Sequence, residues 1–200
     1  MNKHANRKPA VKRVVLSHDE IPRGESCLPI DYCQFYCEEN SWKLIQRDSF
    51  ADASAMFITN PNRQVAIWQQ RAANEAGFVI WDYHVFVVSF DRQLVWDLDS
   101  RLGAPVSLKD WTKGSFPTAN INACIAGNLS PMFHVIEREH FINVFRSDRS
   151  HMLVEGQYTQ TPPAWPKISE AESNLMEYLD QSLETKGKWY SLEKLMGCQN

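Results

Sequence analysis

The chain has 200 residues, a formal net charge of -3 and a composition of 44% hydrophobic and 12% aromatic residues. This length and composition predict one packed globular domain, and the mildly acidic balance gives no basic surface that would bind nucleic acid. No run approaches the roughly 18 apolar residues that a membrane helix needs, so we expect no membrane partner.

The N-terminal segment is basic, since five lysine or arginine residues precede its first acidic residue, Asp19. It lacks the apolar stretch of a secretory signal. We therefore predict a flexible or edge-pairing leader over residues 1–26 and one folded domain over residues 27–200.

The cysteines are odd in number and follow no secretion signal, which favours reduced thiols in a cytoplasmic protein. Cys33 and Cys37 form a CxxxC pair, but no matching Cys/His pair follows it, so we expect no structural zinc. We also expect a monomer. The five cysteines are Cys27, Cys33, Cys37, Cys124 and Cys198.

The stretch "FYCEENSWKL" places a cysteine at the start of a predicted helix over residues 37–47. Trp42 and Ile45 are spaced for one helix face, and two glutamates follow Cys37 in the first turn, where acidic residues favour a helix start. A thiol at this position faces the helix dipole and unpaired backbone N–H groups, which stabilise a thiolate and can hold an oxyanion. Cys37 is therefore a candidate nucleophile, and a half-buried structural thiol is the alternative.

After this helix the sequence becomes rich in β-forming residues and predicts an antiparallel sheet. Helix first, then sheet, then mixed elements indicates an α+β domain. The predicted strands cover 54–60, 65–71, 78–89, 93–98 and 133–138, the helices cover 107–113, 139–146, 171–182 and 191–197, and 101–105, 119–131 and the Pro-rich 162–166 are connecting segments.

His84 lies within the very apolar strand "VIWDYHVFVV", so its imidazole must face a specific partner. The two-residue periodicity of a strand puts Asp82, His84 and Phe86 on one face, with Trp81 and Tyr83 on the other. If this strand forms an antiparallel hairpin with "QLVWDLD", a short turn places His84 opposite Asp97 and a longer loop places it opposite Asp99. The turn has no glycine, so its length does not follow from the sequence.

Several of these motifs occur together in one known family. The chain resembles the protein N-terminal glutamine amidohydrolases, the deamidases of the N-degron pathway, over roughly residues 33 to 196. The matching segments are "YCEENSWKL", Ile67-Trp68 with Gln70, "VIWDYHV", "WDLD", in which the family usually begins with Tyr, "SDRSHM" and the Pro-rich 162–166.

The resemblance implies that residues 27–200 are a catalytic domain with a papain-like or transglutaminase-like fold. It places the family's catalytic triad at Cys37, His84 and Asp97, and it implies neither a metal nor an organic cofactor. The expected reaction converts an N-terminal glutamine to glutamate and releases ammonia through a cysteine thioester. The alternatives are a cysteine hydrolase that acts on internal glutamine or peptide bonds, and a non-catalytic adaptor that binds N-termini.

An enzyme for chain termini must recognise a free α-ammonium, which requires a carboxylate near the pocket. By proximity in sequence the candidates are Glu38, Glu39 and Asp82, whereas Trp68 and Tyr83 are candidates for the pocket wall. In "SDRSHM", Asp148, Arg149 and His151 are candidates for a supporting ion-pair loop, with His151 as an alternative catalytic base.

Overall fold

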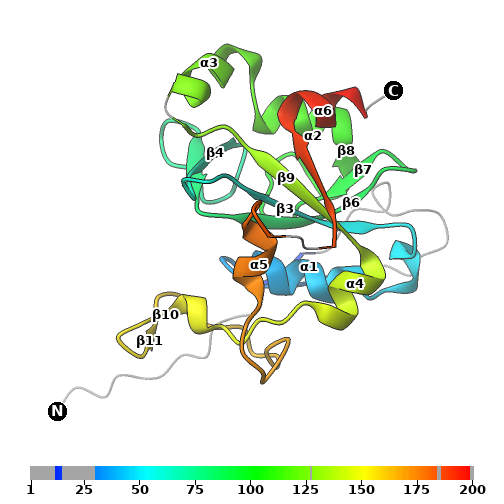
Figure 1. The fold of residues 1–200 in the computed structure, drawn as a ribbon, viewed down its shortest axis with the longest axis vertical. Helices are drawn as coiled ribbons and strands as arrows, with labels where there is room; N and C mark the ends of the chain where they lie inside the picture. Colours follow the sequence, from blue (N-terminus) through cyan, green and yellow to red (C-terminus); the bar gives the residue numbers. More distant parts are fainter. Residues whose placement is uncertain (1–11, 15–29, 127, 184–185, 199–200) are drawn as a thin grey trace.

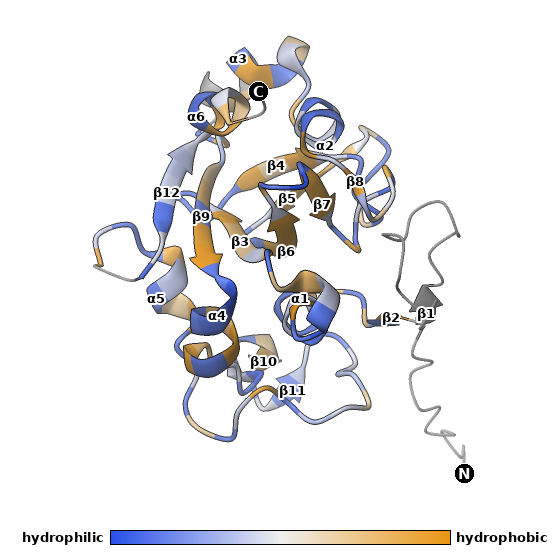
Figure 2. Ribbon diagram, turned by 90° about the vertical axis from the view of Figure 1, so that its right-hand side faces the viewer, coloured by the Kyte–Doolittle hydropathy of each residue, from blue (hydrophilic) through white to orange (hydrophobic). Residues whose placement is uncertain are grey.

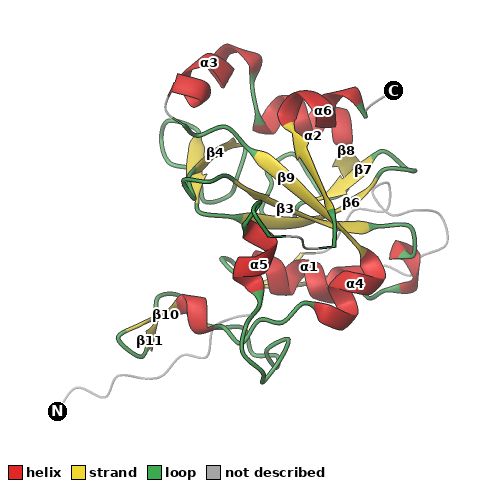
Figure 3. Cartoon of the chain, in the orientation of Figure 1, coloured by secondary structure: helices red, strands yellow, loops and turns green. Residues whose placement is uncertain are grey.

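The computed structural model describes residues 12–14, 30–126, 128–183 and 186–198. Its centre is a six-stranded antiparallel sheet with strand order β12-β9-β3-β6-β7-β8 (Figures 1 and 3). The strands are β3 (Ser54–Thr59), β6 (His84–Ser89), β7 (Leu94–Trp96), β8 (Val106–Ser107), β9 (Met132–Glu137) and β12 (Lys188–Ser191).

Helices cover both faces of this sheet. In Figure 1, α1, α4 and α5 lie below the strands and α2 and α6 lie above them, while α3 lies at the upper edge. The helices are α1 (Cys37–Ile45), α2 (Leu108–Ser115), α3 (Thr118–Ala126), α4 (Arg138–Val144), α5 (Leu175–Leu179) and α6 (Leu192–Gly197).

Each face of the sheet has its own apolar core, because alternate strand residues point to opposite sides. Val85 and Val87 of β6 pack with α1, α4 and α5, whereas Phe86 and Val88 pack with Trp111 of α2. The strands in the middle of the sheet are accordingly mostly hydrophobic (Figure 2). The sheet is therefore a buried middle layer, and α1 is held rigidly against one side of it.

Three two-stranded ribbons and two short 3-10 turns complete the described chain. β4 (Val65–Trp68) pairs with β5 (Phe78–Trp81), and β10 (Leu153–Val154) pairs with β11 (Gln157–Tyr158). The third ribbon joins β1 (Lys12–Val14) to β2 (Ile30–Tyr32). The 3-10 turns are Asp48–Phe50 and Ser150–Met152.

The predicted mixed α and β domain with an antiparallel sheet is confirmed, as is the helix that begins at Cys37. The loop predicted over 119–131 is wrong, because α3 occupies most of it. In the leader predicted over 1–26, Lys12–Val14 forms an edge pair with β2, and its other residues lie outside the described part of the chain. No described helix is long and apolar enough to cross a membrane.

The single strand predicted over 78–89 is wrong, because the chain leaves one sheet and enters another at Asp82 and Tyr83. β5 belongs to the ribbon with β4, and β6 begins at His84. The alternation of faces is broken at this point. Trp81 therefore lies on the same side as His84, and their rings stack with centroids 5.8 Å apart.

The β6–β7 hairpin has the longer of the two loops considered. Val87 pairs with Trp96 and Val88 pairs with Val95, a register that would place position 99 opposite His84 if the ladder continued. The ladder ends at Trp96, however, and the chain turns at Asp97. The short-turn register that would pair His84 with Asp97 is therefore wrong, but the turn still brings Asp97 to His84.

Candidate active site

Cys37 is the first residue of α1 and lies at the end of a tight, well-braced loop. Phe35 adopts the left-handed conformation with φ 70°, and the side chain of Asn40 braces the loop from within the helix. Asn40 accepts a hydrogen bond from the Cys33 backbone N–H at 2.9 Å and donates one to the Cys33 carbonyl at 2.8 Å. These contacts fix the chain just before Cys37, so its side chain has a defined position at the sheet.

His84 and Asp97 form a fully buried pair, with His84 Nε2 2.9 Å from Asp97 Oδ1. Three further donors converge on the same carboxylate. The Asp99 backbone N–H donates to Oδ1 at 3.1 Å, while Gln70 Nε2 and Trp111 Nε1 donate to Oδ2 at 2.8 and 3.1 Å. Both carboxylate oxygens are therefore hydrogen-bonded, which fixes the orientation of Asp97 and, through it, of the imidazole.

The charges of this pair stabilise one another. Burial alone disfavours both charged forms, but the Asp97 carboxylate raises the pKa of His84 above its ordinary value. In the same way, His84 together with the Gln70 and Trp111 hydrogen bonds lowers the pKa of Asp97 despite its burial. The site therefore contains a carboxylate that is charged and an imidazole that readily accepts a proton.

The Cys37 thiol rests in its protonated form. Burial raises the pKa of Cys37 well above its ordinary value, and the neighbouring Glu38 raises it further. Burial and neighbouring carboxylates thus oppose any stabilisation of the thiolate by the helix start. A base must remove the proton if this sulfur is to act as a nucleophile.

Cys37 and His84 line the same pocket, which has a volume of about 220 Å³. Aromatic side chains form part of its wall, and two carboxylates reach it. Its lining residues are Phe35, Cys37, Trp81, Asp82, Tyr83, His84, Asp99, His151, Met152, Thr159 and Gln160. The pocket thus joins the start of α1, the β5–β6 junction and the segment around β10 and β11.

Glu38 is enclosed behind this pocket and is held by residues of its wall. Tyr83 donates a hydrogen bond to Glu38 Oε2 at 3.3 Å, and His151 Nε2 lies 3.4 Å from Oε1 and 3.0 Å from the Tyr83 hydroxyl. Burial lowers the pKa of His151, but Glu38 more than compensates and raises it above its ordinary value. His151 is therefore paired with Glu38, while Asp97 pairs with His84.

Glu39 points away to a different partner. It forms a two-pronged ion pair with Arg149 at 2.6 and 2.8 Å, and Trp165 Nε1 donates to it at 2.7 Å. Arg149 thus takes the supporting role expected of its loop, whereas Asp148 accepts a hydrogen bond from the Ser150 backbone N–H. Because Glu39 is already neutralised, it is not available to a substrate cation.

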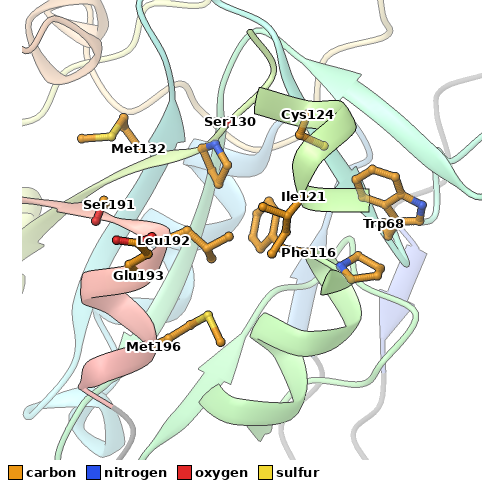
Figure 4. Close-up of a pocket in the computed structure, with 12 residues that line it drawn as sticks. Trp68, Phe116, Ile121, Cys124, Ser130, Met132, Ser191, Leu192, Glu193 and Met196 are labelled. Atoms are coloured by element: carbon orange, nitrogen blue, oxygen red, sulfur yellow. The ribbon is translucent and has the colours of Figure 1, made fainter. Parts of the chain in front are cut away.

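Trp68 lies at another pocket. It packs against Phe78, with ring centroids 5.1 Å apart, at the opposite end of the β4–β5 ribbon from Trp81. Figure 4 shows it at the rim of a mainly apolar pocket of about 280 Å³, together with Phe116, Ile121 and Met196. We therefore assign no substrate contact to Trp68. Tyr83 and Asp82, in contrast, do line the pocket that contains Cys37.

Asp99 also reaches the pocket of Cys37, and the Tyr32 hydroxyl donates a hydrogen bond to its Oδ1. In the described part of the chain, ligand atoms of His84, Asp97 and Asp99 lie within 4.8 Å of one another, which is close enough for a metal ion. The His84 and Asp97 atoms already hydrogen-bond to each other, however. Their arrangement is explained without a cation.

Sequence reasoning did not assign roles to Asn40, Tyr32 and Trp111, and it noted Gln70 only as part of a motif. Each of these makes a contact with a residue far away in the sequence or across a loop, so no local periodicity reveals it. The sequence signal for Gln70 is the stretch "IWQQ", in which two glutamines directly follow apolar strand residues.

A buried imidazole–carboxylate pair that shares a pocket with a cysteine at a helix start provides the groups that amidases with a cysteine nucleophile use. Residues 32–199 match the family described as N-terminal glutamine amidase, and the chain belongs to this family. Similar proteins include "Protein N-terminal glutamine amidohydrolase" of Caenorhabditis elegans, 37% identical over 76% of this chain and 85% of that protein. The proteins of the same name from Bos taurus and Homo sapiens are each 32% identical, over 88% of both chains and 84% of both chains respectively.

Proposed function

We propose that this protein hydrolyses the side-chain amide of an N-terminal glutamine in proteins and peptides, releasing ammonia and leaving glutamate. The observation that carries the proposal is the pocket shared by Cys37 and the Asp97-bound His84, in a chain whose relatives are named for this reaction. The reaction is the deamidation step of an N-degron pathway, carried out in the cytoplasm by a monomer.

The proposed catalytic residues are Cys37, His84 and Asp97. His84 takes the proton of the Cys37 thiol as the sulfur attacks the amide carbon, and the backbone N–H groups at the start of α1 stabilise the oxyanion. His84 then gives its proton to the departing ammonia, which leaves an acyl thioester. Water, deprotonated by His84, hydrolyses this thioester to glutamate and restores the thiol.

Asp97 holds the imidazole in one orientation and stabilises its protonated form. Its bond to Nε2 leaves Nδ1 as the nitrogen that exchanges protons with Cys37 and the substrate. The raised pKa of His84, which Asp97 causes despite burial, supports this role because the imidazole must hold a proton between two steps. This assignment also explains why a thiol with a raised pKa can be activated without a metal.

The proposed fold class is papain-like or transglutaminase-like. It rests on a helix that starts at the nucleophile and packs against an antiparallel sheet, on which first His84 and then Asp97 follow in the chain. We assign residues 27–200 to the catalytic domain and residues 1–26 to the leader. The family match from residue 32 onward supports this division.

Within the pocket, the aromatic ring of Tyr83 and the carboxylate of Asp82 are the proposed substrate contacts at the wall and the rim. Glu38 acts from behind the wall, since its hydrogen bond with Tyr83 fixes the tyrosine hydroxyl. The wall between β5 and β6 thus orients the glutamine side chain above Cys37.

Mass spectrometry of a synthetic peptide that begins with glutamine tests the proposal. Conversion of the amide to the acid raises the peptide mass by about 1 Da and releases one ammonia per turnover. A shortened peptide would instead indicate a cysteine peptidase, and an unchanged peptide that nevertheless binds would indicate an adaptor. The proposal requires the gain in mass with wild-type protein and its absence with Cys37→Ala.

A further inference from the structure

Four carboxylates lie in or near the pocket of Cys37. Three of them are either already paired with other side chains or exposed at the rim of the pocket. Both oxygens of Asp97 are hydrogen-bonded, as described above. Glu38 has no exposed surface and is paired with His151 behind Tyr83. Asp82 is exposed at the rim, and its Oδ1 accepts a hydrogen bond from the Tyr83 backbone N–H.

Asp99 differs from these three residues. It is 95% buried, with an exposed fraction of 5%, and it still lines the pocket. Tyr32 donates to its Oδ1, and within the described part of the chain no residue hydrogen-bonds to its Oδ2. One carboxylate oxygen of Asp99 is therefore available to a ligand in the pocket, close to His84.

The surroundings of Asp99 leave its negative charge incompletely compensated. Burial raises the pKa of Asp99 to about 6, and Asp97 raises it as well, whereas His84, Tyr32 and Arg71 lower it. Arg71 contacts the backbone here and not the Asp99 carboxylate: its backbone N–H donates to the Asp99 carbonyl at 2.7 Å, and its Nε donates to the Leu98 carbonyl at 3.1 Å. A buried carboxylate with one neutral hydrogen-bond donor is stabilised strongly when a cation with N–H donors arrives.

We propose that Asp99 binds the α-ammonium group of the substrate and thereby restricts the reaction to chain termini. This inference rests on the proposed function and adds a specificity-determining residue to it. The α-nitrogen of glutamine is joined to its side-chain amide carbon by a short aliphatic chain. The two groups can therefore reach Asp99 and Cys37 in one pocket of about 220 Å³.

The assignment accounts for selectivity in physical terms. An internal glutamine presents a neutral amide N–H where the ammonium should be, and an acetylated terminus also lacks the charge. Either substrate would leave Asp99 buried without its cation, which costs far more than losing a contact at the surface. Tyr32 supports this function because its hydroxyl fixes the rotamer of the Asp99 carboxylate.

The test compares two peptides that differ only in the α-ammonium. One begins with glutamine, and the other begins with a 4-carbamoylbutanoyl group, which keeps the side-chain amide and has no α-nitrogen. We measure kcat and KM for ammonia release from both peptides by wild-type protein and by Asp99→Asn. Asp82→Asn and Glu38→Gln are the comparison variants, and any loss that they cause should be equal on the two peptides, because Asp82 and the Glu38–Tyr83 pair act on the glutamine side chain and not on the α-ammonium.

We expect Asp99→Asn to lower kcat/KM for the glutamine peptide by about 10- to 150-fold, mainly through KM, as the loss of a hydrogen bond between charged groups does. The same variant should leave kcat/KM for the desamino peptide nearly unchanged. Tyr32→Phe should give a smaller loss, about 2- to 10-fold, again on the glutamine peptide only.

An equal loss on both peptides would show that Asp99 has a structural role and would overturn the inference while the proposed function stands. The inference also fails if Asp82→Asn or Glu38→Gln, rather than Asp99→Asn, shows the loss restricted to the glutamine peptide. If circular dichroism shows that Asp99→Asn does not fold, Tyr32→Phe is compared on the two peptides instead, and an equal loss on both peptides would then overturn the inference. If wild-type protein releases no ammonia from the glutamine peptide, both the inference and the proposed function fail.

Discussion

Asp97→Asn is the substitution that most sharply tests the role of the buried network. In the wild type, Asp97 accepts four hydrogen bonds, two on each oxygen. Asparagine has one acceptor oxygen, and its NH₂ group must face either His84 and the Asp99 backbone or Gln70 and Trp111. Facing the second pair leaves two buried N–H donors without an acceptor, so we expect the NH₂ group to face His84.

In that orientation the asparagine donates to His84 Nε2, which must become an acceptor. The proton of the neutral imidazole then moves to Nδ1, where it blocks acceptance of the Cys37 proton. A wrong tautomer of this kind lowers kcat by about 10⁴-fold in serine proteases, and we expect a loss of similar size here. Loss of the Asp97 charge also removes the main contribution that holds the pKa of His84 up, so this pKa should fall below its ordinary value.

The stability cost should be moderate in comparison. One or two buried donors without good acceptors cost about 1–3 kcal/mol each, and about 1 kcal/mol lowers Tm by roughly 2–4 °C in a chain of this length. The assays are ammonia release, thermal unfolding, and NMR titration of the His84 ring. The matched control is Asp110→Asn, which changes an exposed carboxylate beside Trp111 in α2. It should leave ammonia release and the His84 titration unchanged and should lower stability by at most about 1 kcal/mol, because Asp110 is the acidic residue in the first turn of α2.

A kcat within tenfold of the wild type, or a smaller loss of kcat for Asp97→Asn than for Asp99→Asn, would contradict the proposed role of Asp97. The first result would show that His84 does not depend on the carboxylate. The second would mean that Asp99, which the hairpin register places opposite His84, orients the imidazole instead.

Four further predictions follow from the site. Cys37→Ala should abolish ammonia release without unfolding the protein, whereas Cys33→Ala should cost little, because burial raises the pKa of Cys33 to about 11 and its sulfur does not line the pocket. Relative to a Gln-initiated peptide, initial rates should fall by about 10²-fold or more for Asn-initiated, N-acetyl-Gln and internal-Gln peptides, since small misplacements of a reacting group are costly. Arg149→Met should lower the free energy of unfolding by about 3–5 kcal/mol in thermal or urea unfolding, because it leaves Glu39 buried without its ion-pair partner. Finally, KM for Gln-initiated peptides should rise as the pH falls below about 6, where Asp99 takes up a proton and loses its charge, and Asp99→Asn should lack this pH dependence.

Each of these has a contrary result. Substantial turnover by Cys37→Ala would remove it as the nucleophile, and comparable rates on internal glutamine would indicate a general protein glutaminase or transglutaminase. An Arg149→Met variant as stable as the wild type would show that the buried ion pair contributes no net stability. Histidine, and carboxyl groups whose pKa is raised, titrate between about pH 5 and pH 8. A KM that does not change over this range would contradict the role of Asp99.

The parts of the fold that the sequence predicted are those with a strong local signal. The helix that begins at Cys37 has an apolar stripe and acidic first turn, and the apolar run from His84 onward is a buried strand. The helix Thr118–Ala126 was missed because its small and polar residues form no apolar stripe. The edge strand Lys188–Ser191 was missed because four residues are too few for a clear alternation.

The site was predictable in its members and less so in its geometry. His84 and Asp97 stand out as polar residues in apolar surroundings, but their contact depends on where the β7 ladder ends. The stacking of Trp81 on His84 required a break between two sheets that periodicity does not show. Glu39 and Arg149, 110 positions apart, are joined only by the tertiary fold, so Glu39 could not be separated from the substrate-binding candidates.

Acid quenching of the reaction shows whether Cys37 forms a thioester with the side chain of an N-terminal glutamine. Wild-type protein is mixed with an excess of a Gln-initiated peptide, quenched within milliseconds to seconds, and digested for mass spectrometry. We expect an adduct on the fragment that contains Cys37, with a mass equal to that of the peptide less about 17 Da for the lost ammonia. Rapid ammonia release with no adduct on Cys37, or an adduct on another cysteine, would show that Cys37 is not the nucleophile.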